Sequence, residues 1–457
     1  MKTTLINCAV KTSKEYDGAR VPQGCLYLLS AARNAGFNIE FRDYQLEKLE
    51  DPLDTSFFLR FIEDDADVLA ISCMSNLLPL VVNTTKIFKE RYTDKTIVLG
   101  GIGPSGVAER LIAEFPHIDV IARGEGERTF PELLRALEGK KSLESVEGLL
   151  LSKEKGVFHI TQPRKRIKNL NNLPLPGYDL VDMKSYETVG IQTARGCPFP
   201  CNFCDVSAYW GHDTTYRSLD LVIKELELIE KQYGFKKVTI LDDTFTLNKG
   251  RVFDFCKAYR DRGLTIQWSA YCRVDLLSDE MIEIFEKSGC YRIFLGVESG
   301  SNNVLRKISK PIDINRLIQV VKKACNKFIV RINLIWGFPF ESMEDLKESV
   351  FLLFYLKEFN CDVSMALLSP LPLSRLYNEK KYRLIFREEL QSSVVSSRFY
   401  LPHGNELVNG KPDILVDLIR KHPDIFPGFY VFEDKLFAQK LEYLNSLGLE
   451  IEKLTRQ

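Results

Sequence analysis

Three cysteines in one short loop carry the strongest chemical signal in this chain. They are Cys197, Cys201 and Cys204, spaced as C-x3-C-x2-C. Three thiolates at this spacing can hold three irons of a cubane [4Fe–4S] cluster, which leaves the fourth iron without a protein ligand. A closed zinc knuckle is the alternative, but it needs a fourth ligand at short range, and the nearest histidine, His212, lies at a different spacing. The loop therefore predicts an open iron–sulfur site at which a further molecule binds.

The same cysteine pattern resembles that of the radical S-adenosylmethionine (SAM) superfamily. The resemblance implies that the open iron binds the amino and carboxylate groups of SAM. It also implies that an electron cleaves SAM to a 5′-deoxyadenosyl radical. Phe203, the residue before the last cysteine, matches the family's aromatic position beside the adenine. We therefore expect a [4Fe–4S] cluster and SAM as cofactors, with Phe203 in the SAM site.

Several segments downstream resemble strand ends that surround SAM in this superfamily. Asp242 and Asp243 end one expected strand, and either carboxylate can accept a hydrogen bond from the SAM ammonium group. A helix-capping or other structural role stays open for each of them. Arg273 ends the next strand, and the resemblance implies that it pairs with the SAM carboxylate or with a family glutamate.

Two further strand ends complete this resemblance. Gly296-Val-Glu-Ser-Gly-Ser301 resembles the family's G-x-E-S-G-S segment, which implies that Glu298 and Ser299 lie near the ribose and methionine part of SAM. Ile335-Trp-Gly-Phe-Pro339 resembles the segment whose backbone contacts adenine. Gly337 in that segment permits a close approach that a side chain would block. These segments follow one another in the order that the family shows.

A scaffold for these segments is predicted from residue 188 onward, where strands and helices alternate. We expect six strands with five helices between them. The strands are Val189–Arg195, Lys237–Leu241, Thr265–Tyr271, Tyr291–Val297, Val330–Trp336 and Cys361–Leu368. The alternation fits the partial (β/α)6 TIM barrel of radical SAM enzymes, which we assign to residues 187–373. A small C-terminal cap, residues 374–457, follows the barrel.

The first 140 residues also alternate between strands and helices, so the expected fold class is α/β. Five βα units at short spacing predict a Rossmann-like, doubly wound parallel sheet, whose ligands bind beyond the carboxyl ends of the strands. A linker, residues 141–186, joins this domain to the barrel and contains an expected hairpin. Its basic run, residues 164–166, is expected to be a solvent-exposed loop.

The N-terminal segments resemble the cobalamin-binding domain that precedes many radical SAM domains. The matching segments are Ile71-Ser-Cys-Met-Ser75, Val98-Leu-Gly-Gly-Ile-Gly103 and Arg123-Gly-Glu-Gly-Glu127. The resemblance implies cobalamin as a third cofactor, bound by small and polar residues of the turns. These residues are Ser72, Met74, Ser75, Asn76, Gly100, Gly101, Gly103, Gly124 and Glu125. The cobalt-binding D-x-H-x-x-G motif is missing from the sequence. Two alternatives remain: cobalamin bound without a histidine ligand, or a relic domain that binds none.

Composition argues against several other classes of function. Lys plus Arg number 62, as do Asp plus Glu, so no net positive charge draws the chain to nucleic acid or to an anionic membrane. The sequence has no long apolar run, and we expect no membrane insertion. Eleven cysteines, most of them scattered through apolar segments, indicate buried thiols in a reducing compartment. We therefore expect a cytoplasmic protein.

Together these resemblances imply a cobalamin-dependent radical SAM enzyme. They favour a methyltransferase that acts on an unactivated carbon of a small-molecule or peptide substrate, with an electron donor such as flavodoxin or ferredoxin. One alternative is a cyclase or rearrangement enzyme without methyl transfer. Another is a radical SAM enzyme whose N-terminal domain binds no cobalamin. A non-catalytic iron–sulfur regulator represents a different class of function.

Overall fold

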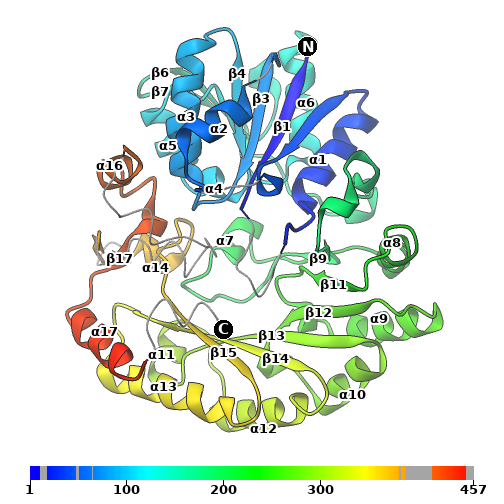
Figure 1. Cartoon of the computed structure of the whole chain (residues 1–457), viewed down its shortest axis with the longest axis vertical. Helices are drawn as coiled ribbons and strands as arrows, with labels where there is room; N and C mark the ends of the chain where they lie inside the picture. The colour runs from blue at the N-terminus through cyan, green and yellow to red at the C-terminus, as the bar shows by residue number, and fades with distance from the viewer. Residues whose placement is uncertain (11–17, 48–50, 64, 380–381, 388–413, 449–457) are drawn as a thin grey trace.

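The computed structural model describes residues 1–10, 18–47, 51–63, 65–379, 382–387 and 414–448. Two α/β bodies lie one above the other in Figure 1, the N-terminal sheet in blue and cyan and the barrel in green and yellow. The C-terminal elements, in orange and red, run along one side of both bodies. Among the described residues, no helix has both the length and the apolar character needed to span a lipid bilayer.

The N-terminal sheet has seven strands in the order β2-β1-β3-β4-β5-β6-β7. The first five are parallel: β1 (Thr3–Cys8), β2 (Ile39–Asp43), β3 (Val68–Cys73), β4 (Thr96–Gly100) and β5 (Val120–Ala122). Successive residues of β3, such as Ala70 and Ile71, point into different hydrophobic clusters on the two faces of the sheet. The predicted doubly wound sheet is therefore confirmed.

Helices cover both faces of this sheet. One face packs against α1 (Gln23–Asn34) and α6 (Gly126–Leu137). The other face packs against α2 (Thr55–Ile62), α3 (Leu78–Arg91) and α5 (Ala108–Glu114). A short helix, α4 (Ile102–Ser105), follows β4 directly at the carboxyl edge.

The hairpin predicted within the linker is confirmed as β6 (Leu149–Glu154) and β7 (Val157–Ile160). Strand β6 pairs with β5 in the antiparallel direction, so the hairpin extends the N-terminal sheet. The sheet thus continues past residue 140, and the proposed domain boundary at that residue stays a prediction.

The basic run of the linker is not a freely solvated loop. Arg164 forms an ion pair with Glu132 at 2.8 Å, and its side chain is only 9% exposed. The Arg166 guanidinium donates hydrogen bonds to the carbonyl oxygens of Trp210, at 2.7 Å, and Asp213, at 2.8 Å. The expectation was wrong for these two arginines, because their partners come from segments far away in the sequence.

The barrel is a six-stranded parallel sheet in the order β15-β14-β13-β12-β11-β8, with β15 and β8 at its two edges. Its strands are β8 (Gly190–Ile191), β11 (Lys237–Ile240), β12 (Gln267–Cys272), β13 (Cys290–Glu298), β14 (Ile329–Trp336) and β15 (Asp362–Leu367). The helices that alternate with them are α8 (Leu219–Lys231), α9 (Lys249–Asp261), α10 (Asp279–Lys287), α11 (Asn302–Lys307), α12 (Ile314–Ala324) and α13 (Met343–Lys357). The predicted partial (β/α)6 barrel is confirmed (Figure 1).

The first barrel strand is shorter than the predicted 189–195. Strand β8 ends at Ile191, and β9 (Ala194–Arg195) pairs instead with β10 (Thr215–Tyr216). Between β8 and β9 the Asp242 carboxylate accepts hydrogen bonds from the backbone N–H groups of Thr193 and Ala194. The Asp242 carboxylate thereby accepts hydrogen bonds that a neighbouring strand would accept in a continuous sheet.

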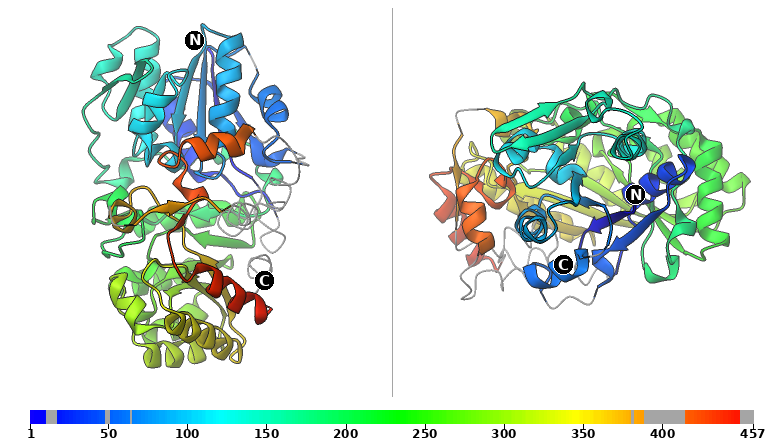
Figure 2. Two further views of the ribbon diagram at one scale, coloured as in Figure 1. Left: turned by 90° about the vertical axis from the view of Figure 1, so that its left-hand side faces the viewer. Right: turned by 90° about the horizontal axis from the view of Figure 1, so that it is seen from above.

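The C-terminal segment contacts both bodies. Helix α16 (Ile414–Lys421) contributes Leu415 and Ile419 to the hydrophobic cluster that contains α3. Helix α17 (Phe437–Ser446) packs on the barrel, where Phe437 lies 5.4 Å from Trp336 between ring centroids. Figure 2 shows the two helices at different heights beside the N-terminal sheet and the barrel.

Candidate active site

The three cysteines lie on the loop between β9 and α7 (Val206–Trp210) and line a single cavity of about 470 Å³. The cavity is surrounded by the carboxyl ends of the barrel strands. Among the described residues, no three Cys, His, Asp or Glu side chains converge closely enough to hold a single metal ion. A cubane cluster needs a wider separation, because each thiolate binds a different iron.

The backbone of the cysteine loop is held from two sides. The Gly196 N–H donates a hydrogen bond to the Asp243 carboxylate at 2.9 Å. The backbone φ of Gly196 is 100°. The Asn202 N–H donates to the Ile308 carbonyl at 3.1 Å. These contacts fix both ends of the loop relative to the barrel.

The surroundings of the thiols combine burial with positive charge. Burial raises the pKa of the Cys204 thiol to about 12, and burial also raises the pKa of Cys201. Lys310 and Arg273 oppose that shift at Cys201, and an Arg273 guanidinium nitrogen lies 3.8 Å from its sulfur. Thiolates need such compensation, since metal binding requires loss of the thiol proton.

Four of the residues predicted to bind SAM line the same cavity: Phe203, Asp243, Arg273 and Glu298. Arg273 also forms an ion pair with Asp275 at 3.0 Å. The Glu298 carboxylate forms a buried ion pair with Lys310 at 2.7 Å, and Glu298 has a φ of 71°. A non-glycine residue with a positive backbone φ at a strand end is a common sign of a functional site.

The other three residues predicted to bind SAM do not line this cavity. Asp242 accepts its hydrogen bonds from Thr193 and Ala194, and burial raises its pKa to about 6. Ser299 is fully buried against Ser349. Gly337 donates its N–H to Glu341 at 2.9 Å. The Asp242 and Ser299 side chains and the Gly337 N–H are all hydrogen-bonded within the protein, and the assignment of these residues to SAM stays a prediction.

A second cavity, of about 460 Å³, lies between the carboxyl edge of the N-terminal sheet and the barrel. Five of the residues predicted to bind cobalamin line it: Ser72, Gly100, Gly101, Gly124 and Glu125. From the barrel side it is lined by Gln192, Arg195, Tyr209 and Trp210. Asp243 and Val206 line both cavities, so the two spaces adjoin at these residues.

The remaining four residues predicted to bind cobalamin lie elsewhere. Ser75 and Gly103 line a smaller cavity next to residues 369–372 and 425–428. Met74 is 48% exposed, and Asn76 is buried, but neither lines one of the two large cavities. Their contact with cobalamin also stays a prediction.

A buried arginine links the two α/β bodies and lines the second cavity. Arg195 donates hydrogen bonds to Glu125 at 2.6 Å and to Glu127 at 2.5 Å, and its side chain is 6% exposed. The two glutamates follow β5 of the N-terminal sheet, whereas Arg195 ends β9, two residues before Cys197. Glu125 thus holds the two bodies together, a role that the sequence pattern did not reveal.

Comparison with known proteins agrees with this division of the chain. The family model described as the B12 binding domain matches residues 14–134, and that of the radical SAM superfamily matches residues 191–353. An uncharacterized methyltransferase, PH0819, of Pyrococcus horikoshii is 33% identical over 366 residues, which cover 78% of this chain and 77% of that protein. The chain belongs to the cobalamin-binding radical SAM family.

Two further similarities concern other members of this family. The anaerobic magnesium-protoporphyrin IX monomethyl ester cyclase of Rubrivivax gelatinosus is 28% identical over 329 residues, 68% of this chain and 58% of that enzyme. The solved structure of the radical SAM methyltransferase TsrM from Kitasatospora setae, with cobalamin and a [4Fe–4S] cluster bound, has a TM-score of 0.71 at 15% identity. It covers 98% of this chain and 91% of that one, which shows the shared fold.

The cofactors of the cobalamin-binding radical SAM family are a [4Fe–4S] cluster, SAM and cobalamin, and both cavities fit them. The barrel cavity offers three thiols and nearby cations. The second cavity is lined by glycine backbone, apolar side chains and a smaller number of polar ones, and the glycines allow a large ring to approach the backbone. No described histidine lines that cavity, which agrees with the missing cobalt-binding motif.

Polar residues of the radical SAM cavity that the sequence did not indicate include Lys310, Arg331 and Asn333. Arg331 and Asn333 alternate with apolar residues along β14, and that alternation is a usable signal for side chains pointing into the barrel. Lys310 follows a helix in a loop, and only its contact with Glu298 reveals its position.

Proposed function

We propose that this enzyme transfers a methyl group from SAM to an unactivated carbon of a small-molecule or peptide substrate in the cytoplasm. The observation that carries this proposal is that the cavity of the cysteines and the cavity of the N-terminal sheet adjoin at Asp243 and Val206. Methyl transfer to a carbon radical needs the radical source and the methyl carrier at one place. The name of the Pyrococcus horikoshii relative supports the same chemistry.

The protein's own residues have distinct tasks in this proposal. Cys197, Cys201 and Cys204 hold the cluster, while Arg273 and Lys310 offset negative charge around it. When bound, the cluster with SAM supplies a 5′-deoxyadenosyl radical, and cobalamin supplies a carrier for the methyl group.

Asp243 lies at the junction of the two cavities. Burial raises its pKa, and its carboxylate accepts the Gly196 N–H. We assign it the task of orienting groups that meet between the two cofactors.

The chemistry also needs one electron from outside the chain, and we propose a flavodoxin or a ferredoxin as the donor. Three exposed cations, Arg306, Lys307 and Arg375, lie in two segments whose backbone contacts the cysteine loop. The Asn202 side chain donates to the Lys307 carbonyl at 2.8 Å, and the Leu376 N–H donates to the Asn202 carbonyl at 2.7 Å. A positive surface around a cluster ligand loop favours an acidic donor.

A second candidate function keeps the cofactors but transfers no methyl group, as in a radical cyclisation or rearrangement. The similarity to the Rubrivivax gelatinosus cyclase favours it. The two candidates differ in one product, because SAM yields S-adenosylhomocysteine only when its methyl group is transferred.

The test uses full-length protein reconstituted anaerobically with iron, sulfide and hydroxocobalamin. Under reducing conditions with SAM, we expect S-adenosylhomocysteine in an amount close to the bound corrinoid, together with 5′-deoxyadenosine. Protein reconstituted without corrinoid is the control and is expected to form only 5′-deoxyadenosine. Formation of 5′-deoxyadenosine without S-adenosylhomocysteine in the complete protein would favour the cyclase candidate. Failure to retain corrinoid would favour a relic N-terminal domain.

A further inference from the structure

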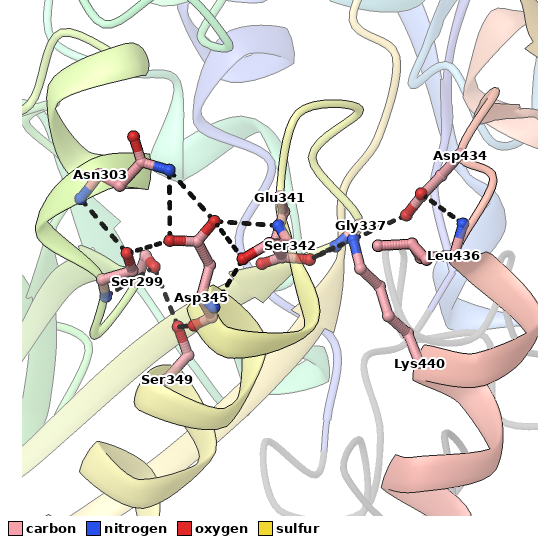
Figure 3. Close-up of polar contacts among 11 residues, drawn as sticks. Ser299, Asn303, Gly337, Glu341, Ser342, Asp345, Ser349, Asp434, Leu436 and Lys440 are labelled. Atoms are coloured by element: carbon pink, nitrogen blue, oxygen red, sulfur yellow. Dashed lines mark hydrogen bonds and ion pairs between the residues drawn. The ribbon is translucent and has the colours of Figure 1, made fainter.

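A buried lysine of the C-terminal helix reaches the end of barrel strand β14. Lys440 lies on α17 and is fully buried, and its ammonium group contacts the carboxylates of Glu341, at 3.0 Å, and Asp434, at 2.7 Å. Figure 3 shows Lys440 between these two carboxylates, with α17 on one side and the turn after β14 on the other. One cation therefore connects a helix outside the barrel to the strand end that the sequence places beside SAM.

Glu341 transmits this contact to the backbone of the turn. Its second contact is the hydrogen bond accepted from the Gly337 N–H at 2.9 Å. Gly337 has a φ of 85°, and a β-carbon there would lie 2.6 Å from the Leu367 side chain. Leu367 itself lines the cavity of the cysteines. The orientation of the Gly337 peptide thus depends on where the Glu341 carboxylate is held.

Burying the Lys440–Glu341 ion pair costs desolvation free energy, so the pair is an inefficient way to attach α17 to the barrel. Burial raises the pKa of Glu341, and its second carboxylate oxygen has no hydrogen-bond partner within the described part of the chain. Replacing such a buried pair by apolar side chains often leaves stability equal or higher, so attachment alone does not account for it. The α17 helix already has apolar contacts, including that of Phe437 with Trp336. Attachment of α17 therefore does not require Lys440.

The neighbouring strand end is held by a different set of groups. Asp345, near the start of α13, accepts hydrogen bonds from Ser342 and from Ser301, and Ser349 contacts Ser299 at 2.9 Å. Figure 3 shows this set beside the Glu341 turn. All of these groups belong to the barrel itself. In the set drawn there, Asp434, Leu436 and Lys440 come from the C-terminal segment, and Lys440 reaches the β14 turn.

We propose that Lys440 is a positioning residue for SAM. It holds the Glu341 carboxylate, which holds the Gly337 peptide in the orientation that the adenine end of SAM meets. The C-terminal helix is then a functional part of the SAM site, although it lies outside the barrel. This inference depends on SAM binding by the radical SAM domain and not on the proposed methyl transfer.

The test measures the dissociation constant of SAM by equilibrium binding to anaerobically reconstituted, unreduced protein. We expect Lys440→Met to weaken SAM binding at least ~10-fold while iron and sulfide content stays that of the wild type. Asp434→Asn is the matched control, because it removes the other partner of Lys440 and leaves Glu341 in place. It is expected to change SAM affinity by less than ~3-fold, whatever its effect on stability.

A double variant separates positioning from attachment. If Lys440 acts through Glu341, Glu341→Met, which removes the acceptor of the Gly337 N–H, alone weakens SAM binding as Lys440→Met does, and the two together are no worse than either one. SAM affinity within ~2-fold of wild type in Lys440→Met would overturn the proposal, as would equal losses in Lys440→Met and Asp434→Asn. Should Lys440→Met fail to fold, Glu341→Met decides, and unchanged SAM affinity in that variant refutes the proposal. None of these outcomes depends on S-adenosylhomocysteine formation, so they are independent of the test of methyl transfer.

Discussion

Two carboxyl edges of parallel sheets face adjoining cavities in this enzyme, and they are built from different groups. The barrel edge presents side chains: three cysteines, with Arg273 and Lys310 beside them. The edge of the N-terminal sheet presents mostly backbone and small residues, among them Gly100, Gly101 and Gly124. One edge is suited to hold metal by covalent ligands, and the other is suited to let a large ring approach.

This difference predicts different sensitivities to substitution. A cluster needs a fixed number of thiolates, so loss of one ligand removes a whole function. A ring that rests on many backbone contacts loses affinity gradually as single contacts are removed. Variants at the barrel edge should therefore abolish chemistry, whereas variants at the N-terminal edge should weaken it.

The largest effect is expected at the cysteine loop. Cys201→Ala, like the equivalent change at Cys197 or Cys204, should abolish cleavage of SAM to 5′-deoxyadenosine, because two thiolates hold the cluster poorly. Product formation after anaerobic reconstitution, measured by liquid chromatography, checks this. Cys256→Ala, in a buried helical position away from the cavity, is the control and should retain cleavage. Full activity of Cys201→Ala would refute the ligand assignment.

The next effect is expected at the residue that connects the two edges. Arg195→Gln leaves Glu125 and Glu127 buried without their cation, which should lower the free energy of unfolding by about 3–5 kcal/mol. Because the two cavities lose their fixed separation, we expect S-adenosylhomocysteine formation to fall at least ~10-fold. Cleavage of SAM to 5′-deoxyadenosine should fall less than ~3-fold.

Arg164→Gln is the matched control for this variant, since it breaks an arginine–glutamate pair that does not involve the barrel, with Glu132 of α6. It should lower stability without changing the ratio of the two products. Equal loss of both products in Arg195→Gln would show that this arginine supports folding alone.

A smaller, graded effect is expected at the N-terminal edge. Gly124 has a φ of 79° and no neighbour within 4 Å of an added β-carbon, and it lines the second cavity. Gly124→Ala should lower the affinity for hydroxocobalamin by roughly 3- to 10-fold, because the methyl group enters the space that the ring would occupy. Gly139→Ala has a similar φ of 76° and the same free space, but lies after α6 away from the cavity.

Comparing Gly124→Ala with Gly139→Ala separates the effect of filling the cavity from the effect of backbone strain. The strain should lower the free energy of unfolding of each variant by about 1–2 kcal/mol. Hydroxocobalamin binding, followed by its visible absorption, is the measurement. If Gly124→Ala and Gly139→Ala bind the corrinoid equally well, the glycine does not contact it.

The sequence was sufficient for the order of the elements and for the cysteine site. Alternating apolar segments predicted both parallel sheets, and the fixed C-x3-C-x2-C spacing predicted three residues that share one cavity. Local patterns specify these features, since a strand's period and a loop's spacing are properties of neighbouring residues. Because the carboxyl ends of parallel strands lie at the same edge of a sheet, the residues at those ends could be predicted to lie near one another.

Long-range partners could not be predicted in this way. Glu125 resembles a cobalamin contact by its segment, but Arg195, 70 residues later, binds its carboxylate. Asp242 has the right place at a strand end, yet its oxygens accept backbone N–H groups of the preceding loop. Lys440 bears no local signal, and its role depends wholly on the packing of α17 against the barrel. Each of these roles is set by a tertiary contact that a single sequence does not display.

The smallest effect is expected at the opposite, amino edge of the N-terminal sheet, where function and stability should separate. His117 lies just before β5, and its ring nitrogen Nε2 is 3.1 Å from the Val82 carbonyl and 3.3 Å from the Thr85 hydroxyl. Burial lowers the pKa of His117 from an ordinary 6.5 to about 4, and the hydrogen bond to Val82 only partly opposes this.

Between pH 6.5 and 4 the unfolded chain therefore binds a proton at this site that the folded chain does not. The contribution of His117 is complete above pH 6.5 and is lost as the pH falls toward 4, by at most about 1.4 kcal/mol per pH unit. His117→Gln, which keeps a hydrogen-bond donor but does not titrate, should flatten this part of the stability profile. His159→Gln, on β7, is the matched comparison for a histidine-to-glutamine change elsewhere in the sheet. The midpoint of urea unfolding by circular dichroism at pH 7 and at pH 5 measures the stability of both variants.

Hydroxocobalamin affinity at pH 7 should be the same in the two variants and the wild type, because His117 does not line the second cavity. A loss of affinity in His117→Gln alone would show that the two edges of the sheet are coupled.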